Sequence, residues 1–163
     1  MSRLQAIFAA MLFAFSWVSR GSASAQAPPT PEQILASKGI STSSLTSLRQ
    51  ALQDPRPDVR GLAAFELADK KDKESIPLIK EALAKASTAL EKQNLAGALI
   101  MLRDPQGNTA MKEVCEDETV REDSRVIGAN QLWDAGDPGC MVAVIKILSS
   151  TDDHSVKLHK GRW

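Results

Sequence analysis

The sequence repeats itself three times at a spacing of 32 to 33 residues, and this period constrains the fold more than any other feature. The segments that start at Val59, Glu91 and Glu122 align so that three aspartates coincide, namely Asp72, Asp104 and Asp137. A basic residue lies twelve positions before each aspartate, an alanine eight before it and a leucine five before it. Fixed periods of this length are typical of stacked-repeat proteins, in which each unit buries its apolar face only against its neighbours.

Helix signals run through all the repeats, whereas no alternating apolar and polar run is long enough for a strand. Pro31 suits the first turn of a short helix that Gly39 ends, and Ser41 to Ser44 supply N-cap oxygens for the next helix. We predict helices over residues 31–38, 45–52, 58–69, 74–86, 88–103, 107–116, 121–135 and 138–150. The pattern predicts an all-α solenoid of about four stacked helix pairs over residues 32–150. The tail, residues 151–163, has no periodic pattern and stays unassigned.

The first full unit carries residues that resemble a known repeat family. They are Asp54, Pro55, Asp58, Val59, Arg60, Ala63, Ala64 and Leu67, followed by Asp72, Ile76, Pro77, Ile79, Ala82 and Leu83. This run resembles a HEAT repeat of the kind first described in phycobilisome lyases. The match is weaker in the second unit, where Thr109 replaces the expected proline, and it recovers at Asp137-Pro138 in the third. The resemblance implies a right-handed α-solenoid used mainly for protein contacts, with the second helices lining its concave face.

The N-terminal residues predict export. Arg3 precedes an apolar run from Leu4 to Val18, and small residues lead to an Ala23-Ser24-Ala25 cleavage site, as in a secretory signal peptide. A run of 15 residues is shorter than the roughly 20 that a membrane-spanning helix needs. We expect residues 1–25 to be a signal peptide, residues 26–31 to be a leader, and the mature chain to be periplasmic or secreted. A retained N-terminal anchor is the alternative.

Charge and cysteine content exclude two further classes. Removal of residues 1–25 would leave 163 − 25 = 138 residues and change the formal net charge from 0 to −2, because two arginines are lost. Near neutrality a chain lacks the basic excess of a nucleic-acid binder, so we expect no nucleic-acid partner. The only cysteines, Cys115 and Cys140, are too few for a disulfide-rich scaffold.

The repeat register also predicts the state of the two cysteines. It places them eight positions apart in neighbouring parallel helices, which corresponds to about 12 Å of helical rise. A disulfide needs α-carbons within about 7 Å of each other. We therefore expect Cys115 and Cys140 to stay unpaired even in an oxidising compartment.

Motifs for catalysis or metal binding are scarce. The chain has no nucleophile elbow, no glycine-rich phosphate loop and no zinc-protease histidine pair. Its two histidines, His154 and His159, lie in the unassigned tail, where no rigid ligand frame is expected. The acidic residues Glu116 to Glu118 lack calcium-loop spacing and lie close to the start of a helix, where carboxylates favour the dipole. We expect no enzyme activity, no metal site and no cofactor.

Two sets of charged residues recur with the repeat. We interpret the first as a structural ladder, in which basic residues reach aspartates of their own or the adjacent unit: Arg60, Lys92, Arg125, Asp72, Asp104 and Asp137. The second set occupies second-helix columns outside the apolar stripe, and the resemblance turns these columns toward the concave groove. Its members are the candidate partner-binding residues Arg49, Lys80, Glu81, Lys112, Glu113 and Lys146. An ordinary solvated face with weak cross-repeat ion pairs is the alternative.

These observations predict a non-enzymatic scaffold or adaptor in the cell envelope or extracellular space that binds another protein or a peptide. A chromophore-lyase-like or other enzyme-associated role and a purely structural spacer are the alternatives. Ile145 occupies the column of Arg49, Lys80 and Lys112, so the last unit presents an apolar side chain where cations precede it. Since a terminal repeat needs a polar outer face, we expect residues 151–163 to cover the last unit, or the array to continue.

Overall fold

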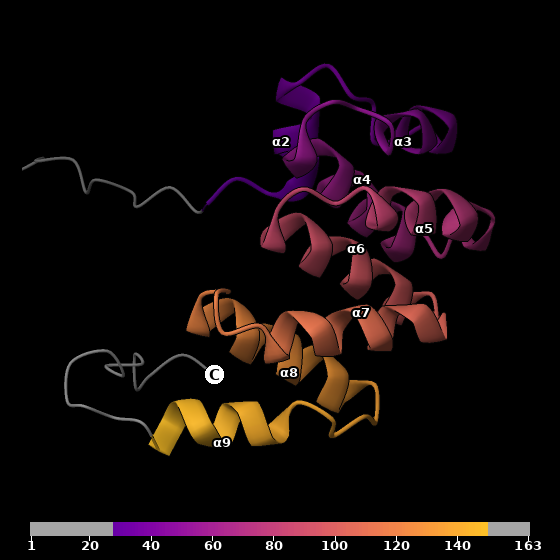
Figure 1. The fold of residues 1–163 in the computed structure, drawn as a ribbon. Helices are drawn as coiled ribbons and strands as arrows, with labels where there is room; N and C mark the ends of the chain where they lie inside the picture. The colour runs from indigo at the N-terminus through magenta and orange to yellow at the C-terminus, as the bar shows by residue number, and fades with distance from the viewer. Residues whose placement is uncertain (1–27, 150–163) are drawn as a thin grey trace, which may run out of the picture.

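The computed structural model describes residues 28–149, and its helices stack from the N-terminal pair at one end to the C-terminal pair at the other (Figure 1). Within this range the chain has no strand, and its helices are α2 Pro31–Ser37, α3 Leu45–Ala51, α4 Pro57–Asp69, the 3-10 turn η1 Lys73–Ser75, α5 Ile76–Ala84, α6 Ala89–Met101, α7 Pro105–Glu116, α8 Glu122–Asp134 and α9 Met141–Ser149. They form four pairs: α2 with α3, α4 with α5, α6 with α7, and α8 with α9. The predicted all-α solenoid of about four helix pairs is confirmed.

Helix boundaries lie close to the predicted ranges, with a clear difference at α7. This helix begins at Pro105 and not at residue 107, because the Asp104 carboxylate accepts a hydrogen bond from the Gln106 amide at 3.0 Å and caps the helix. Proline is well suited to the first helical position, since its missing N–H would have no partner there. α7 is therefore one turn closer to its unit's aspartate than the sequence pattern indicates.

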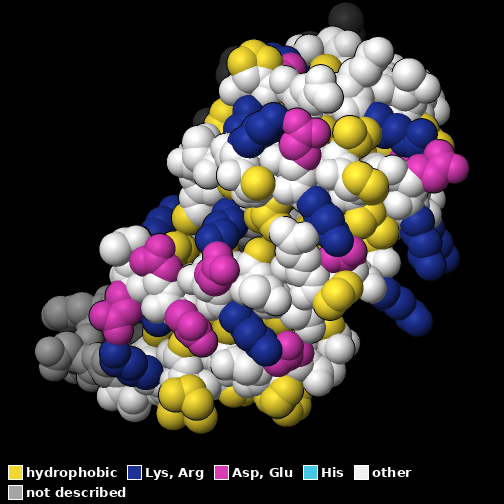
Figure 2. Space-filling model, turned by 45° about the vertical axis from the view of Figure 1, so that its right-hand side comes forward, with side chains coloured by type: hydrophobic (Ala, Val, Ile, Leu, Met, Phe, Trp, Pro, Cys, Tyr) yellow, Lys and Arg dark blue, Asp and Glu magenta, His cyan; other side chains and the backbone are white. Residues whose placement is uncertain are grey.

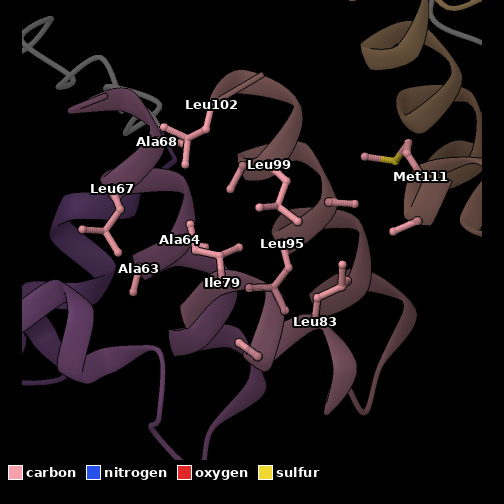
Figure 3. Close-up of a cluster of buried hydrophobic side chains, with 14 of the residues drawn as sticks. Ala63, Ala64, Leu67, Ala68, Ile79, Leu83, Leu95, Leu99, Leu102 and Met111 are labelled. Carbon is pink, nitrogen blue, oxygen red and sulfur yellow. The ribbon is translucent and has the colours of Figure 1, made fainter. Parts of the chain in front are cut away.

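The repeated small and leucine columns form the core between successive first helices. Ala64, Ala96 and Ala129 are all buried, which allows α4, α6 and α8 to pack through short side chains. Leu67, Leu99 and Leu132 are also fully buried, and Figure 3 shows part of this cluster between α4 and α6. Burying each leucine contributes roughly 1.5–3 kcal/mol, so the same column stabilises every unit.

Each first helix ends in the same way. The residue directly before each column aspartate has a positive φ: 58° at Lys71, 62° at Arg103 and 82° at Gly136. The following aspartate donates its backbone N–H to the carbonyl of the column leucine five residues earlier, at 2.8 to 2.9 Å. This is the Schellman arrangement, in which a left-handed residue redirects the chain and satisfies the last helical carbonyls. Gly39 takes the same conformation at the end of α2, which identifies α2 and α3 as a shortened leading unit.

These helix ends make a stability prediction. Lys71 and Arg103 are non-glycine residues in a backbone conformation that favours glycine, so Lys71→Gly and Arg103→Gly are each expected to raise the free energy of unfolding by about 0.5–1 kcal/mol. The matched control is Gly136→Ala, which should lower it by about 1 kcal/mol at the equivalent position. Urea denaturation of the three variants measures these changes. Stabilisation by Gly136→Ala would contradict the assignment of a left-handed helix end.

The units are packed unevenly. α4 and α6 lie against each other over much of their length, whereas α8 packs less closely against α6. The second helix α7 approaches α6 so closely that a Cβ on Gly107 would lie 2.6 Å from the backbone nitrogen of Ile100. The stack is thus tight between α6 and α7 and more open between the first helices α6 and α8.

The last pair departs from the expected pattern. Leu148, predicted as part of the apolar stripe of the second helices, is 47% exposed, and Ile147 is buried in its place. The stripe has shifted by one residue, and Ile145 is 60% exposed, so α9 presents an apolar outer face. Apolar side chains also protrude at the level of α9 in Figure 2. The predicted cover for this face, residues 151–163, lies outside the described residues, as do the predicted signal peptide and the tail histidines. Among residues 28–149, no helix is long and apolar enough to cross a membrane.

Candidate interaction groove

An ion-pair ladder joins each unit to the next, but its members differ from the prediction. Arg49 of α3 donates from Nε to Asp72 Oδ2 at 2.8 Å, and its guanidinium also reaches Glu74. In the same way Lys80 of α5 pairs with Asp104 at 2.7 Å, and Lys112 of α7 pairs with Asp137 at 2.8 Å. A cation in the second helix of one unit therefore holds the turn of the following unit.

The predicted partners of the column aspartates were wrong. Arg60 binds Glu91 of the next first helix at 2.6 Å and donates to the Asp54 carbonyl. Lys92 pairs with Glu113 within its own unit, and Arg125 donates from Nε to the Cys115 carbonyl at 2.7 Å. The reason is geometric, since these basic residues lie near the start of the first helices and the aspartates follow the opposite end.

The candidate partner-binding residues are all held by the chain itself. Arg49, Lys80 and Lys112 belong to the ladder, and Glu113 is paired with Lys92. Glu81 pairs with Lys85 one turn later in α5, and Lys146 pairs with Glu118. Charge reversal at Lys80 or Lys112, expected to spare the fold, would set two carboxylates against each other and weaken the contact between units.

A signal for this ladder was present in the sequence. The three cation–aspartate pairs are separated by 23, 24 and 25 residues, a spacing that recurs in each unit. Basic and acidic side chains are interspersed across the face in Figure 2, without a large patch of one sign. Among the cavities, Glu81 lines one of about 330 Å³ and Glu113 one of about 310 Å³, both in the loops between units.

The third rung of the ladder is sensitive to acid. The Lys112 ammonium, the Asn108 amide and the Gly139 N–H hold the pKa of the Asp137 carboxyl below its ordinary value. The hydrogen bond from Asp137 raises the pKa of Lys112. Because the folded-state pKa of Asp137 is lowered, this rung stabilises the fold above the carboxyl's ordinary pKa, and the stabilisation is lost as pH falls through the folded-state value.

A groove of about 980 Å³ opens where α6 and α8 separate. Phe65 of α4 and Ile100 and Met101 of α6 supply its large apolar side chains, while α8 supplies Gln131 and Asp134. The Met101 side chain is 44% exposed, and methionine adapts readily to different apolar ligands. The groove thus joins three successive first helices, on residues that the sequence did not indicate as a site.

The polar groups of the groove are only partly satisfied. The Gln131 side-chain oxygen is buried and has no hydrogen-bond partner among the described residues. Asp104 and Asp137 also line the groove but are held by Lys80 and Lys112. Arg103 and the exposed Asp134 are the other charged groups of its lining. The arrangement offers an apolar surface, one hydrogen-bond acceptor and one charge of each sign.

The two cysteines lie elsewhere than the repeat register predicts. Both are free and buried in the structure, but their thiols are neighbours that interact directly, so the expected separation of about 12 Å was wrong. The turn that carries Cys140 crosses the C-terminal half of α7, where Gly139 contacts the Lys112 side chain. Within residues 28–149, no group of three or more His, Cys, Asp or Glu side chains could hold a metal ion.

Comparison with known proteins agrees with the repeat architecture. The family model for HEAT repeats matches residues 45–129, which include α3 to α7 and most of α8. No curated protein and no solved structure matches the chain. The matched segment covers more than half of the sequence and contains the repeated alanine, leucine and aspartate columns. The chain belongs to the HEAT-repeat family.

Proposed function

We propose that this protein is a non-enzymatic interaction module that binds a segment of another protein in the groove between α6 and α8. HEAT repeats commonly mediate contacts between proteins, and stacked repeats offer extended surfaces for them. The observation that supports this site is the opening of the stack at these two helices, with a volume of about 980 Å³. That volume is at the upper end of the roughly 300–1,000 Å³ range of ligand pockets, and it suits several residues of a peptide.

The groove lining suggests the chemistry of the partner. Ile100, Met101 and Phe65 favour a large apolar side chain, and the unpartnered Gln131 oxygen favours an N–H or O–H donor beside it. Asp134 and Arg103 favour a basic and an acidic residue on the flanks of that side chain. The occupant is therefore a short peptide segment with an apolar anchor between residues of opposite charge.

The cellular location of this activity is also part of the proposal. The positive start, apolar run and A-x-A site of residues 1–25 support export to the cell envelope or the extracellular space. The partner would then be another envelope or extracellular protein, acting with this chain as a scaffold or adaptor. The phycobilisome-lyase type of repeat is supported by the residue pattern of the first unit, from Asp54 to Leu83.

Two other functions make different predictions for the same groove. A chromophore-lyase-like or other enzyme-associated role requires that the groove bind a small organic molecule in preference to a peptide. A structural spacer requires that it bind neither. The apolar lining and the unpartnered Gln131 oxygen favour a ligand over a spacer, and the charges of opposite sign favour a peptide.

A peptide-display selection against the purified full chain tests the proposal. Enriched peptides should share an apolar residue flanked by basic and acidic residues, and Met101→Glu should weaken their binding at least about tenfold by placing a charge in the apolar groove. The matched control is Leu90→Glu, since Leu90 also lies on α6 and is 60% exposed but does not line the groove. Failure to enrich any sequence, or equal loss of binding in both variants, would contradict the proposed site.

A further inference from the structure

Cys115 and Cys140 form a buried pair that joins the last helix to the stack. Cys115 lies near the end of α7, and Cys140 immediately precedes α9. Both side chains are almost completely enclosed, and their thiols interact with each other. The pair is remote in sequence, and it takes no part in the groove described above.

Neighbouring contacts explain why the two thiols meet. Lys112 of α7 holds Asp137 by an ion pair of 2.8 Å, and its side chain lies against Gly139, where a Cβ would be only 2.4 Å from Lys112 Cε. Cys115 is three residues after Lys112 and therefore on the same face of α7, while Cys140 directly follows Gly139. The turn that begins at Asp137 thus delivers Cys140 to Cys115.

We propose that Cys115 and Cys140 form an intramolecular disulfide that fastens the start of α9 to the end of α7 when the protein folds under oxidising conditions. The last pair is where such a link has most effect, because α9 packs chiefly on α8 and presents an exposed apolar face. The bond closes the chain from residue 115 to residue 140, which includes all of α8. Closing such a loop restricts the unfolded chain and stabilises the folded one.

The reaction is a thiol–disulfide exchange, and a low-molecular-weight disulfide such as oxidised glutathione is the oxidant. One protein thiolate attacks the glutathione disulfide, forms a mixed disulfide and releases one glutathione thiolate. The second protein thiolate attacks the protein sulfur of the mixed disulfide, forms the Cys115–Cys140 bond and releases the second glutathione thiolate. The protein loses two protons and two electrons, and the oxidant gains both electrons as its sulfur–sulfur bond is broken.

Burial sets the order of folding and oxidation. Burial raises the pKa of both the Cys115 and the Cys140 thiol, so the reactive thiolate is scarce in the folded, reduced protein. The enclosed sulfurs are also hard for glutathione to reach. Oxidation therefore occurs during folding or while α9 is detached, and once formed the bond is protected from external thiols in the same way.

The test is to refold the denatured, reduced full chain with a mixture of reduced and oxidised glutathione and to measure its intact mass. The expected product is a monomer that has lost two hydrogen atoms, gives one linked peptide on digestion and melts at least about 5 °C above the reduced form. Cys115→Ala and Cys140→Ala are the controls, and each should leave one thiol and abolish the shift in melting temperature. A refolded wild-type monomer in which both thiols remain free for alkylation would overturn the proposal.

A second measurement keeps the proposal testable if an alanine variant folds poorly. The folded, reduced wild-type chain should react with oxidised glutathione much more slowly than the same chain in denaturant, and low concentrations of urea should accelerate the reaction by detaching α9. Equal rates in the folded and the denatured state would contradict the burial of the pair. This outcome does not depend on what occupies the groove.

Discussion

Replacement of Arg60 by methionine is expected to lower the free energy of unfolding by about 3 kcal/mol. The Glu91 side chain is fully buried, and its Oε1 accepts from Arg60 at 2.6 Å while Oε2 accepts from the Ser87 amide at 2.8 Å. Removing Arg60 would leave the carboxylate enclosed between α4 and α6 without its cation. Breaking a buried pair on one side typically costs about 3–5 kcal/mol.

A double-mutant cycle checks this explanation. Arg60→Met combined with Glu91→Leu should recover much of the lost stability, because the buried charge is removed along with its partner. Urea denaturation of the two single variants and the double variant gives the coupling energy. Lys85→Met is the control on an exposed pair, and it should cost no more than about 1 kcal/mol. A loss of similar size for Arg60→Met would show that water solvates Glu91.

Gly107→Ala is expected to be comparably damaging, at about 3 kcal/mol. A Cβ at this position would lie 2.6 Å from the Ile100 nitrogen and 2.8 Å from the Ala96 carbonyl oxygen. Both are backbone atoms of α6, so relief requires that α6 and α7 move apart as whole helices. Thermal denaturation of the variant should show a clearly lower melting temperature, while circular dichroism still reports a helical protein.

Gly97→Ala is the matched control for Gly107→Ala. Gly97 also lies within a helix of the same unit, but the nearest atom to a new Cβ is the Gln131 side-chain oxygen at 3.1 Å. A flexible side chain can move, and alanine in place of glycine favours a helix by roughly 0.5–1 kcal/mol. The expected change in stability is therefore close to zero. Equal destabilisation by the two variants would contradict the close approach of α6 and α7.

The architecture could be predicted from the sequence because its signals are local and repeated. The alanine and leucine columns recur at one period, and each unit needs them for the same reason, namely to bury a first helix against the next. Helix ends were also readable, since Pro31 and Gly39 act through their own backbone preferences. The same repetition allowed the recurrent aspartates to be assigned to structural roles before their partners were known.

The pairing of charges and the site could not be predicted in the same way. Which cation reaches Asp72 or Asp137 depends on the displacement of one unit relative to the next, and a single-unit alignment carries no information on this displacement. Cys140 was misplaced for the same reason, because its turn crosses the middle of α7. The groove results from unequal packing of α8 and α4 against α6, which no column of residues records.

The most direct test of the account is to locate a bound peptide on the protein. A peptide from the display selection would be titrated into the ¹⁵N-labelled full chain, and amide chemical shifts would be followed. If the partner enters the groove between α6 and α8, the largest shifts should fall at Gly97, Ile100, Met101, Gln131 and Asp134. Shifts concentrated on the second helices, at Lys80, Lys112 and Glu113, would instead place binding on the ion-paired face and contradict the proposed groove.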